Sequence, residues 1–186
     1  MQRAAVILDR DGVINHDSST YIKTLEEFSL IQGSAQAIAD LHLAGWPVFI
    51  ITNQSGIARG LYNEQTLADM HSYLYRAVSE LGGDIQAIYY CPHHPDDHCA
   101  CRKPQPGLFL QLALEHPVDL ESSYYVGDKI TDMLAARVIK AKPVLVKTGK
   151  GAQTLHHPVI KQNLIPVYSN LADFANKLLA DSDQEE

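Results

Sequence analysis

Short, uninterrupted apolar runs alternate along this chain with segments whose apolar residues recur every three or four positions. The runs, which are typical of strands buried on both faces, cover residues 4–8, 47–51, 87–90, 124–126, 144–146 and, as an edge strand, 166–168. Helices are expected at 34–44, 64–81, 107–115, 130–139 and 171–179. Strands that alternate with helices favour right-handed crossovers and a mainly parallel sheet. The sequence therefore predicts an α/β fold, a Rossmann-like three-layer sandwich.

The length of the chain predicts one compact domain. Its 186 residues are close to the usual size of a single domain, and 46% of them are hydrophobic, which is enough for a substantial core. We expect one domain over residues 1–186, with Ser34 and Asn170 as helix caps. Residues 181–186 are expected to form a solvated tail.

The charge balance and the hydropathy argue against two broad classes of protein. The chain has 15 Lys and Arg residues against 22 Asp and Glu residues, a formal net charge of −7. An acidic surface disfavours general binding to nucleic acid, which requires clustered cations. No stretch approaches the roughly 18 apolar residues of a membrane span, and the first apolar run is too short for a signal peptide. We therefore expect a cytoplasmic location.

Polar side chains follow four of the expected strands, at the point where each strand ends. These residues are Asp9, Thr52, Cys91 and Asp128. The carboxyl ends of parallel strands meet at one edge of a sheet, and ligands of such sheets bind there. The sequence therefore places its chemically active groups at a single edge.

Acidic residues gather at two of these strand ends. Asp9 and Asp11 are two positions apart, and side chains at this spacing on extended backbone point the same way. Two carboxylates that close need a cation or a shared proton. Asp128, with Asp132 one helical turn further on, brings more carboxylate oxygen, the donor that Mg²⁺ prefers. A polar turn at 9–12 and a helix cap at Asp128 are the alternative interpretations.

Two further segments supply groups suited to an anion. Thr52 offers a hydroxyl, and Asn53, Gln54 and Ser55 offer backbone and side-chain donors. Adjacent cations at 102–103 precede a Pro-rich turn and form a candidate phosphate clamp. An ordinary strand-to-loop turn and two solvated surface cations are the alternatives.

The three cysteines lie in one short segment together with three histidines. Cys91, Cys99 and Cys101 with His93 match the donors of a tetrahedral Cys₃His zinc site, and a filled tetrahedron is structural. His94 and His98 are alternative ligands. A zinc-binding loop at about 91–101 would fix the direction of the cations that follow it.

These residues together resemble a known superfamily. Asp-Arg-Asp-Gly at 9–12, Thr-Asn-Gln at 52–54, Lys103 in Arg-Lys-Pro and Gly-Asp-Lys-Ile-Thr-Asp at 127–132 are similar, in this order, to the four motifs of haloacid-dehalogenase-type (HAD) phosphatases. The resemblance implies that Asp9 is the nucleophile and Asp11 the general acid and base. It also implies that Thr52 and Lys103 hold the transferred phosphate. Mg²⁺ would be bound by Asp9, the backbone carbonyl of Asp11 and Asp128.

Two other segments narrow the resemblance to one branch with a minimal cap. Asn-Gln-Ser-Gly-Ile-Ala-Arg-Gly at 53–60 and the Cys/His loop with Cys-x-Cys-Arg-Lys-Pro are similar to HAD phosphatases that remove the 7-phosphate of D-glycero-D-manno-heptose 1,7-bisphosphate, a step towards the lipopolysaccharide core. The implied substrate-binding residues are Asp17, Tyr21, Asn53, Gln54, Ser55, Arg102 and Lys129. Within this set, Arg102 would bind the second phosphate and the 15–21 loop would close over the site.

Two other functions remain open at this point. The histidinol-phosphate phosphatase group resembles the chain in having the same zinc loop. A regulatory module that accepts a phosphate on Asp9 without turnover is the non-enzymatic alternative, although Asp11 argues against it, since a stable phosphoaspartate needs no general acid. For the enzyme we expect a monomer that acts on a small sugar bisphosphate, without nucleic-acid or membrane partners.

Overall fold

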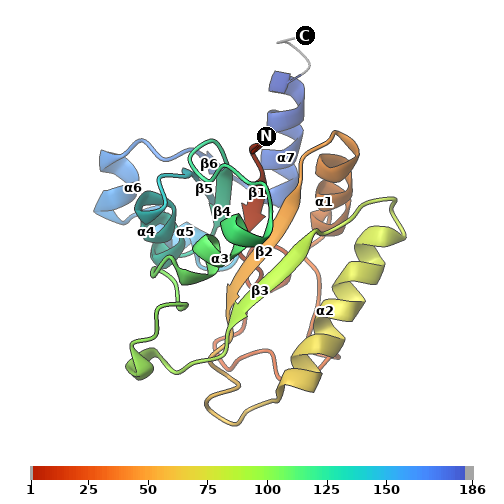
Figure 1. The fold of residues 1–186 in the computed structure, drawn as a ribbon, viewed down its shortest axis with the longest axis vertical. Helices are drawn as coiled ribbons and strands as arrows, with labels where there is room; N and C mark the ends of the chain where they lie inside the picture. Colours follow the sequence, from red (N-terminus) through yellow and green to blue (C-terminus); the bar gives the residue numbers. More distant parts are fainter. Residues whose placement is uncertain (1, 183–186) are drawn as a thin grey trace.

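The fold is built on one six-stranded parallel sheet (Figure 1). A computed structural model describes residues 2–182 of the chain. The strands are β1 (Val6–Leu8), β2 (Val48–Asn53), β3 (Ala87–Cys91), β4 (Tyr124–Gly127), β5 (Lys142–Val146) and β6 (Val167–Tyr168). Their order in the sheet is β3-β2-β1-β4-β5-β6, and every neighbouring pair is parallel. The predicted α/β class and strand positions are confirmed.

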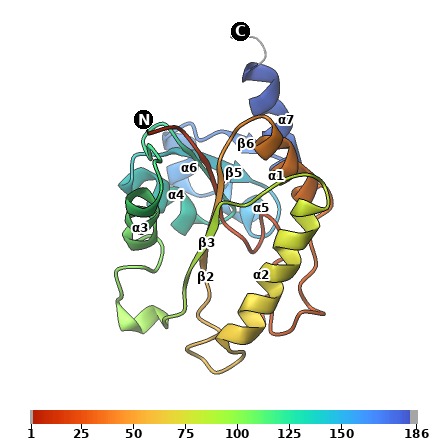
Figure 2. The same ribbon diagram turned by 45° about the vertical axis from the view of Figure 1, so that its right-hand side comes forward.

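Helices cover both faces of this sheet (Figure 2). They are α1 (Ser34–Leu43), α2 (Glu64–Ser79), α3 (Gly107–Glu115), α4 (Ile130–Val138), α5 (Gly151–Thr154), α6 (Pro158–Gln162) and α7 (Leu171–Ser182), with a 3₁₀ turn η1 (Pro95–Asp97). The helices α1, α2 and α7 pack on one face, and α3 and α4 pack on the other. The result is the predicted three-layer sandwich.

The continuous apolar character of the strands follows from this double cover. In β1, Val6 and Leu8 pack into the core beneath α1, α2 and α7, whereas Ile7 packs into the core beneath α3 and α4. All three side chains are fully buried. Alternate residues of a strand point to opposite faces, so a strand covered on both sides has no position for a polar residue until it ends.

Of the two predicted helix caps, one is wrong and one is confirmed. Ser34 does not cap α1; it is the first helical residue, Gly33 precedes it in a left-handed conformation, and its hydroxyl donates to the carbonyl of Ile14. Asn170 does cap α7, because its side chain accepts the backbone N–H of Asp173. Of the expected tail, residues 181–182 continue α7, and 183–186 lie outside the described residues.

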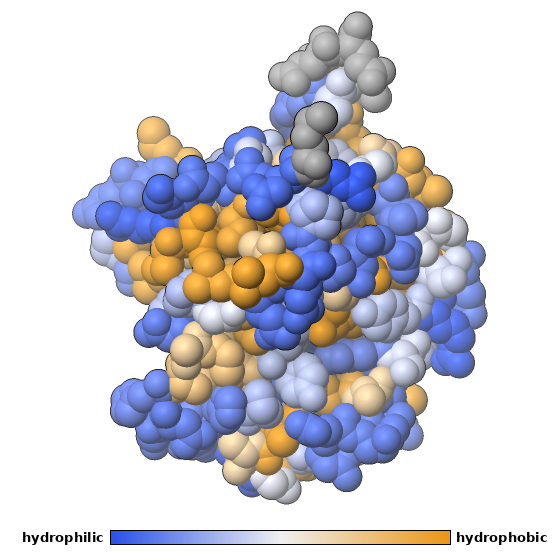
Figure 3. All heavy atoms as spheres, viewed as in Figure 1, coloured by the Kyte–Doolittle hydropathy of each residue, from blue (hydrophilic) through white to orange (hydrophobic). Residues whose placement is uncertain are grey.

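An apolar strip is exposed on the outer side of α3. Leu110 is 53% and Leu114 is 88% exposed, and Figure 3 shows apolar surface over this part of the molecule. The inner side of the same helix is buried against the sheet through Leu108, Phe109 and Leu112. This helix is therefore apolar on both sides, although only one of them packs against the core.

The central position of β1 determines where a site can form. It lies between β2 and β4, so the loops that follow these three strands leave the sheet side by side. No helix within residues 2–182 has the length and apolar character needed to cross a membrane.

Candidate active site

Asp9 follows β1 directly and is almost completely buried, with 3% of its surface exposed. Its Oδ1 lies 2.8 Å from the ammonium group of Lys103. Burial and the negative charge of Asp132 raise the pKa of Asp9 to about 6, against the opposing effect of Lys103. A buried carboxylate of this kind needs positive charge nearby to stay ionised.

Three oxygen atoms converge on the ammonium group of Lys129. Its Nζ lies 4.0 Å from Asp9 Oδ2, 3.6 Å from Asp128 Oδ1 and 3.3 Å from the backbone carbonyl oxygen of Asp11. The same three groups are those expected to hold Mg²⁺. Burial raises the pKa of Asp128 to about 8, although Lys129 opposes the shift. The arrangement is therefore a small cage of oxygens that favours a cation.

Asp128 is built into the structure in a way that suits a metal ligand. Its Oδ1 is buried and has no hydrogen-bond partner among the described residues, whereas Oδ2 accepts the backbone N–H of Lys150 at 2.7 Å. Glycine lines the carboxylate on two sides, because a Cβ at Gly12 or Gly149 would overlap with Asp128 Oδ2. The helix cap is at Lys129 instead. Lys129, 3.6 Å away, is the nearest positive charge to this oxygen but lies beyond hydrogen-bond distance. A buried carboxylate oxygen that accepts no hydrogen bond costs free energy unless a cation binds it, so these oxygens fit Mg²⁺.

Asp132 lies in the same acidic group but has a different structural role. Its Oδ1 accepts from Lys103 Nζ at 2.8 Å and from the hydroxyl of Tyr125 at 3.0 Å. Its Oδ2 accepts the backbone N–H groups of Asp128 and Lys129 at 3.2 and 3.0 Å. Both oxygens are thus occupied by protein donors. Asp132 positions Lys103 and the start of α4 rather than a metal.

Asp11 is held by a network of donors. Its Oδ1 accepts from Arg10 Nε and Nη2 at 3.0 and 2.8 Å and from Asn15 Nδ2 at 2.9 Å, and its Oδ2 accepts from Gln54 Nε2 at 3.0 Å. Burial raises the pKa of Asp11, but the Arg10 charge and the hydrogen bonds outweigh it and leave the pKa below its usual value. Asp11 is therefore a carboxylate in the resting site.

The guanidinium group of Arg10 is itself fully buried. It lies over the ring of Phe28 at 5.1 Å, and its Nη1 donates to His71 Nε2 at 3.2 Å. Burial, and then the Arg10 charge, lower the pKa of His71 to about 3. His71 is thus neutral and accepts a hydrogen bond from Arg10, so a residue of α2 holds the guanidinium group in place.

A cleft of about 500 Å³ opens above these groups. Its walls include the following predicted residues: Asp11, Asp17, Tyr21, Asn53, Gln54, Ser55, Arg102, Lys103 and Lys129. A smaller pocket of about 30 Å³ at its floor is lined by Asp9, Thr52 and Lys103, among others. The structure thus brings the predicted catalytic and substrate-binding residues to one place.

Asn53 has a more specific position than the sequence indicated. Its Oδ1 accepts the backbone N–H of Lys103 at 3.0 Å, and its Nδ2 donates to the backbone carbonyl of Lys103 at 3.2 Å. These paired bonds join the end of β2 to the Lys103 turn. Asn53 therefore fixes the position of the Lys103 backbone relative to the end of β2, in addition to lining the cleft.

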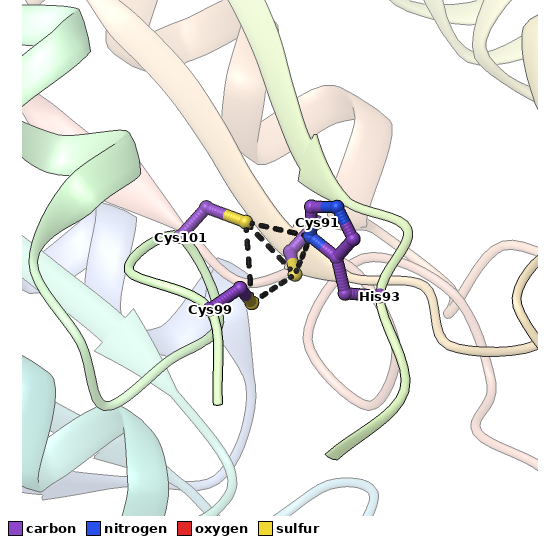
Figure 4. Close-up of side chains that lie close together, drawn as sticks. All are labelled: Cys91, His93, Cys99 and Cys101. Carbon is purple, nitrogen blue, oxygen red and sulfur yellow. Dashed lines mark hydrogen bonds between the residues drawn. The ribbon is translucent and has the colours of Figure 1, made fainter. Parts of the chain in front are cut away.

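A second cluster lies beside the cleft, in the loop after β3 (Figure 4). Donor atoms of Cys91, His93, Cys99 and Cys101 all lie within 4.8 Å of one another. Their separations run from 3.1 Å for His93 Nδ1 to Cys101 Sγ, up to 3.6 Å for Cys91 Sγ to His93 Nδ1. A zinc tetrahedron with bonds of 2.0–2.3 Å has edges of roughly 3.5–3.8 Å, so the four donors are grouped as Zn²⁺ requires, slightly more tightly than in a metal-bound site.

The two alternative histidines have other positions. His94 caps η1, since its Nδ1 accepts the backbone N–H of Asp96 at 3.2 Å. His98 has a left-handed backbone conformation and is not part of the four-residue cluster. The geometry favours His93 over both.

Sequence reasoning missed several residues of the site. Arg10, Tyr62, Thr131 and Lys150 were given no function, yet Tyr62, Thr131 and Lys150 line the cleft and Arg10 holds Asp11. Arg10 could have been found, because a charged residue between two motif aspartates has to be either exposed or paired. Thr131 lies within the motif at 127–132, which could have drawn attention to it, whereas nothing in the local sequence marks Tyr62 or Lys150.

The carboxyl edge of the sheet thus carries a buried aspartate, a group of oxygens suited to a cation and a cleft lined by basic side chains, as expected of a HAD-like hydrolase. A HAD-hydrolase-like family model matches residues 100–174. The D-glycero-beta-D-manno-heptose-1,7-bisphosphate 7-phosphatase of Pseudomonas aeruginosa is 52% identical over 179 residues, which cover 96% of this chain and 99% of the relative. The protein of the same name from Bordetella bronchiseptica is 44% identical and covers 95% and 98%.

A solved structure agrees with these relatives. The crystal structure of D,D-heptose 1,7-bisphosphate phosphatase from B. bronchiseptica, complexed with magnesium and phosphate, matches with a TM-score of 0.88 at 44% identity. The match covers 96% of this chain and 99% of that one. The chain belongs to the family of D-glycero-beta-D-manno-heptose-1,7-bisphosphate 7-phosphatases.

Proposed function

We propose that this chain is a Mg²⁺-dependent phosphatase that removes the 7-phosphate of D-glycero-D-manno-heptose 1,7-bisphosphate, through a phosphate ester of Asp9. The observation that carries the proposal is the grouping of the expected Mg²⁺ ligands: Asp9 and Asp128 offer carboxylate oxygens within 4.8 Å of each other, and these two groups and the Asp11 carbonyl oxygen surround the ammonium group of Lys129. A sugar bisphosphate brings two anionic groups, and the cleft offers cations at its floor and at its rim. The relatives from Pseudomonas aeruginosa and Bordetella bronchiseptica are named for this reaction.

Asp9 is the proposed nucleophile. Its carboxylate forms a bond to phosphorus while the bond from phosphorus to the sugar oxygen breaks, so that the phosphoryl group moves to Asp9. Mg²⁺ bound by Asp9, Asp128 and the Asp11 carbonyl would neutralise charge on the phosphoryl oxygens. Lys103 and Thr52 line the same pocket and are placed to bind those oxygens, which is the positioning that phosphoryl transfer chiefly requires.

Asp11 is the proposed general acid and base. The departing sugar oxygen takes a proton from Asp11, which later accepts one from the water that hydrolyses the Asp9 ester. In the resting site Asp11 is ionised; a phosphate dianion bound next to it would raise its pKa, so that Asp11 takes up a proton from the solvent before the phosphoryl group is transferred. Oδ2 accepts one hydrogen bond and Oδ1 accepts three, so Oδ2 is the oxygen better placed to carry the proton.

Arg102 is the proposed site for the second phosphate. It lines both the cleft and a neighbouring pocket of about 240 Å³ that also contains His98 and Cys99. Its Nη1 is buried without a hydrogen-bond partner among the residues described, and a guanidinium group binds phosphate through two parallel hydrogen bonds. The zinc cluster ends at Cys101, one position before Arg102. We therefore assign Zn²⁺ the structural task of directing this arginine.

The opposite wall of the cleft comes from the 15–21 loop. Asp17 Oδ2 lies 3.3 Å from Lys129 Nζ, and the ring of Tyr21 lies 5.8 Å from the Arg59 guanidinium group. These contacts join the loop to Lys129 at the start of α4 and to the loop after β2. We propose that Asp17 and Tyr21 bind the sugar hydroxyls, and that Lys129 keeps Asp9 and the phosphate in register.

The proposed setting is that of a cytoplasmic monomer. Every group of the proposed site comes from one chain, so a single copy is sufficient for the reaction. A heptose bisphosphate for the lipopolysaccharide core is a small phosphorylated precursor, which is consistent with the cytoplasm.

The test is a direct comparison of substrates. Purified protein with Mg²⁺ is given the α and β anomers of the heptose 1,7-bisphosphate and, separately, histidinol phosphate, and released phosphate is measured. We expect turnover of a heptose bisphosphate with a kcat/KM at least 100-fold above that for histidinol phosphate. A preference for histidinol phosphate would overturn the proposed substrate, and a stable phosphoprotein without turnover would overturn the enzymatic function.

A further inference from the structure

Tyr62 forms the outer end of a hydrogen-bonded chain that reaches two residues of the proposed active site. Its hydroxyl donates to Gln54 Oε1 at 2.5 Å. Gln54 Nε2 in turn donates to Thr52 Oγ1 at 2.9 Å and to Asp11 Oδ2 at 3.0 Å. Gln54 is 97% buried, with 3% of its surface exposed, so these bonds are its main polar contacts.

The direction of every bond in this chain is determined. The Nε2 atom of Gln54 faces Asp11 Oδ2 and Thr52 Oγ1. The other oxygen of the Asp11 carboxyl group already accepts three hydrogen bonds, so Asp11 acts as an acceptor and the amide of Gln54 turns its NH₂ group towards it. Its Oε1 then faces Tyr62, which must donate. Burial raises the pKa of Tyr62 to about 12, so the phenol keeps the proton that it donates.

This direction has a consequence for Thr52. Because Thr52 Oγ1 accepts a hydrogen bond from Gln54, its own hydrogen is left for another acceptor. Thr52 lines the pocket that also contains Asp9 and Lys103, where a phosphoryl oxygen would be that acceptor. The amide of Gln54 thus makes Thr52 a donor towards the phosphate and holds Asp11 Oδ2 in place.

Tyr62 is fixed tightly enough to act in this way. A Cβ at Gly56 would overlap with the Tyr62 ring, so the ring packs directly on the backbone of the loop after β2. The backbone N–H of Leu61 also donates to the carbonyl of Gly56 at 2.9 Å. The loop therefore presents the hydroxyl to Gln54 at a defined distance.

We propose that Tyr62 is a positioning residue for phosphoryl transfer, which acts through Gln54 on Thr52 and Asp11; the proposal rests on the proposed function of this site. Without the phenol, Gln54 Oε1 loses the donor that holds it on its outer side. The amide could then shift away from Asp11 Oδ2 and Thr52 Oγ1, which would weaken the two hydrogen bonds that position these groups.

The kinetic test compares Tyr62→Phe with wild type, with Gln54→Leu and with the double variant. We expect Tyr62→Phe to lower kcat about tenfold, as the loss of one hydrogen bond worth about 1.4 kcal/mol would, with KM changed less than twofold. The double variant should be no slower than Gln54→Leu alone, because Tyr62 acts through Gln54. Tyr73→Phe is the matched control, since its ring packs edge-on against Phe28, and it should leave kcat unchanged.

Two kinetic outcomes would overturn the proposal. One is an unchanged kcat in Tyr62→Phe. The other is an additive loss in the double variant together with a raised KM, which would mean that Tyr62 binds the substrate directly. The assay uses whichever phosphate ester the wild type hydrolyses fastest. A wrong substrate assignment would therefore appear as a different preferred substrate of the wild type, and would leave the variant-to-wild-type ratios of kcat and KM interpretable.

A second measurement is independent of turnover. The side-chain amide resonances of Gln54, identified by their loss in Gln54→Leu, are followed by NMR in the wild type, Tyr62→Phe and Tyr73→Phe. We expect them to shift or broaden in Tyr62→Phe only. Unchanged resonances in Tyr62→Phe would show that Tyr62 does not orient this amide, even if no substrate is turned over.

Discussion

Lys103 and Asp132 form an ion pair of 2.8 Å in which both side chains are almost completely buried. Asp132 belongs to the first turn of α4 and Lys103 to the turn after the zinc cluster, so the pair joins two segments that are distant in sequence. Burial raises the pKa of Asp132, but the charges of Lys103 and Lys129 outweigh it and leave the pKa lowered. The pair holds Lys103 next to Asp9.

Asp132→Asn should destabilise the protein and lower its kcat. Removal of one partner leaves a buried Lys103 that is compensated by Asp9 alone, and breaking such a pair costs about 3–5 kcal/mol. We expect urea unfolding at pH 7 to show a loss of this order, together with a lower kcat. The exposed Glu80→Gln change on the same molecule should alter neither, and an unchanged midpoint for Asp132→Asn would contradict the structural role.

Asp9→Asn should abolish nearly all turnover. The amide is close in shape to the carboxylate but cannot form the phosphate ester, so the fold is expected to persist without the reaction. Phosphate release from the heptose bisphosphate should fall by a factor of at least 10³, while the circular dichroism spectrum stays that of the wild type. Substantial hydrolysis by this variant would mean that another group attacks phosphorus.

Arg102→Ala should act on binding rather than on chemistry. With the second phosphate unpaired, we expect KM for the bisphosphate to rise about tenfold or more with kcat changed less than threefold, the pattern of a lost uniform binding interaction. A phosphomonoester that has no second phosphate is the matched control and should be affected much less. Equal increases in KM for both substrates would mean that Arg102 does not bind the second phosphate.

Loss of the zinc cluster should resemble the loss of Arg102. Cys101→Ser removes one of the four donors, and structural zinc in such clusters contributes directly to local folding. We expect about one zinc per chain in the wild type and much less in the variant, measured by elemental analysis. KM for the bisphosphate should rise in the variant. Full zinc content in Cys101→Ser would show that the metal is held elsewhere.

His71 should make the protein less stable in mild acid. Its pKa is lowered to about 3 by burial and by Arg10, against an ordinary value near 6.5 in the unfolded chain. Above pH 6.5 the unfolded chain gains no proton at this site, so the stability is complete. As the pH falls below 6.5, His71 binds a proton in the unfolded state but not in the folded state. The free energy of unfolding therefore falls by about 1.4 kcal/mol per pH unit.

His71→Gln keeps an acceptor for Arg10 but cannot titrate. Between pH 7.5 and pH 5, the free energy of unfolding of the wild type should fall by about 2 kcal/mol more than that of the variant. The exposed His156→Gln change is the control and should follow the wild type. Parallel curves for the wild type and His71→Gln would mean that the buried imidazole accepts a proton within the fold.

The strand ends could be predicted because burial on both faces leaves a clear mark in the sequence. An apolar run has to stop where the chain leaves the sheet, and this placed Asp9 and Asp128 correctly beside each other. The short helices α5 and α6 were not predicted, since four or five residues are too few to show a helical period. Ser34 was misassigned as a cap because its hydroxyl binds a distant carbonyl, which no local pattern reveals.

The supporting residues of the site were harder to predict for the same reason. His71 lies on the buried side of α2, where the helical pattern indicates only a core position. Its contact with Arg10 joins residues 61 positions apart, which the local sequence does not reveal. Tyr62 follows a loop without a motif of its own. Such residues have functions that depend on the tertiary structure, which sequence spacing does not encode.

The Cys/His loop contributes Arg102 from outside the sheet, whereas Asp9 and Asp128 follow β1 and β4 directly. The proposed site for the second phosphate and the proposed nucleophile with its metal ligand thus belong to separate stretches of polypeptide. In evolution, insertions or replacements between residues 92 and 102 could redirect such an enzyme to new metabolites while the hydrolytic machinery is passed on unaltered.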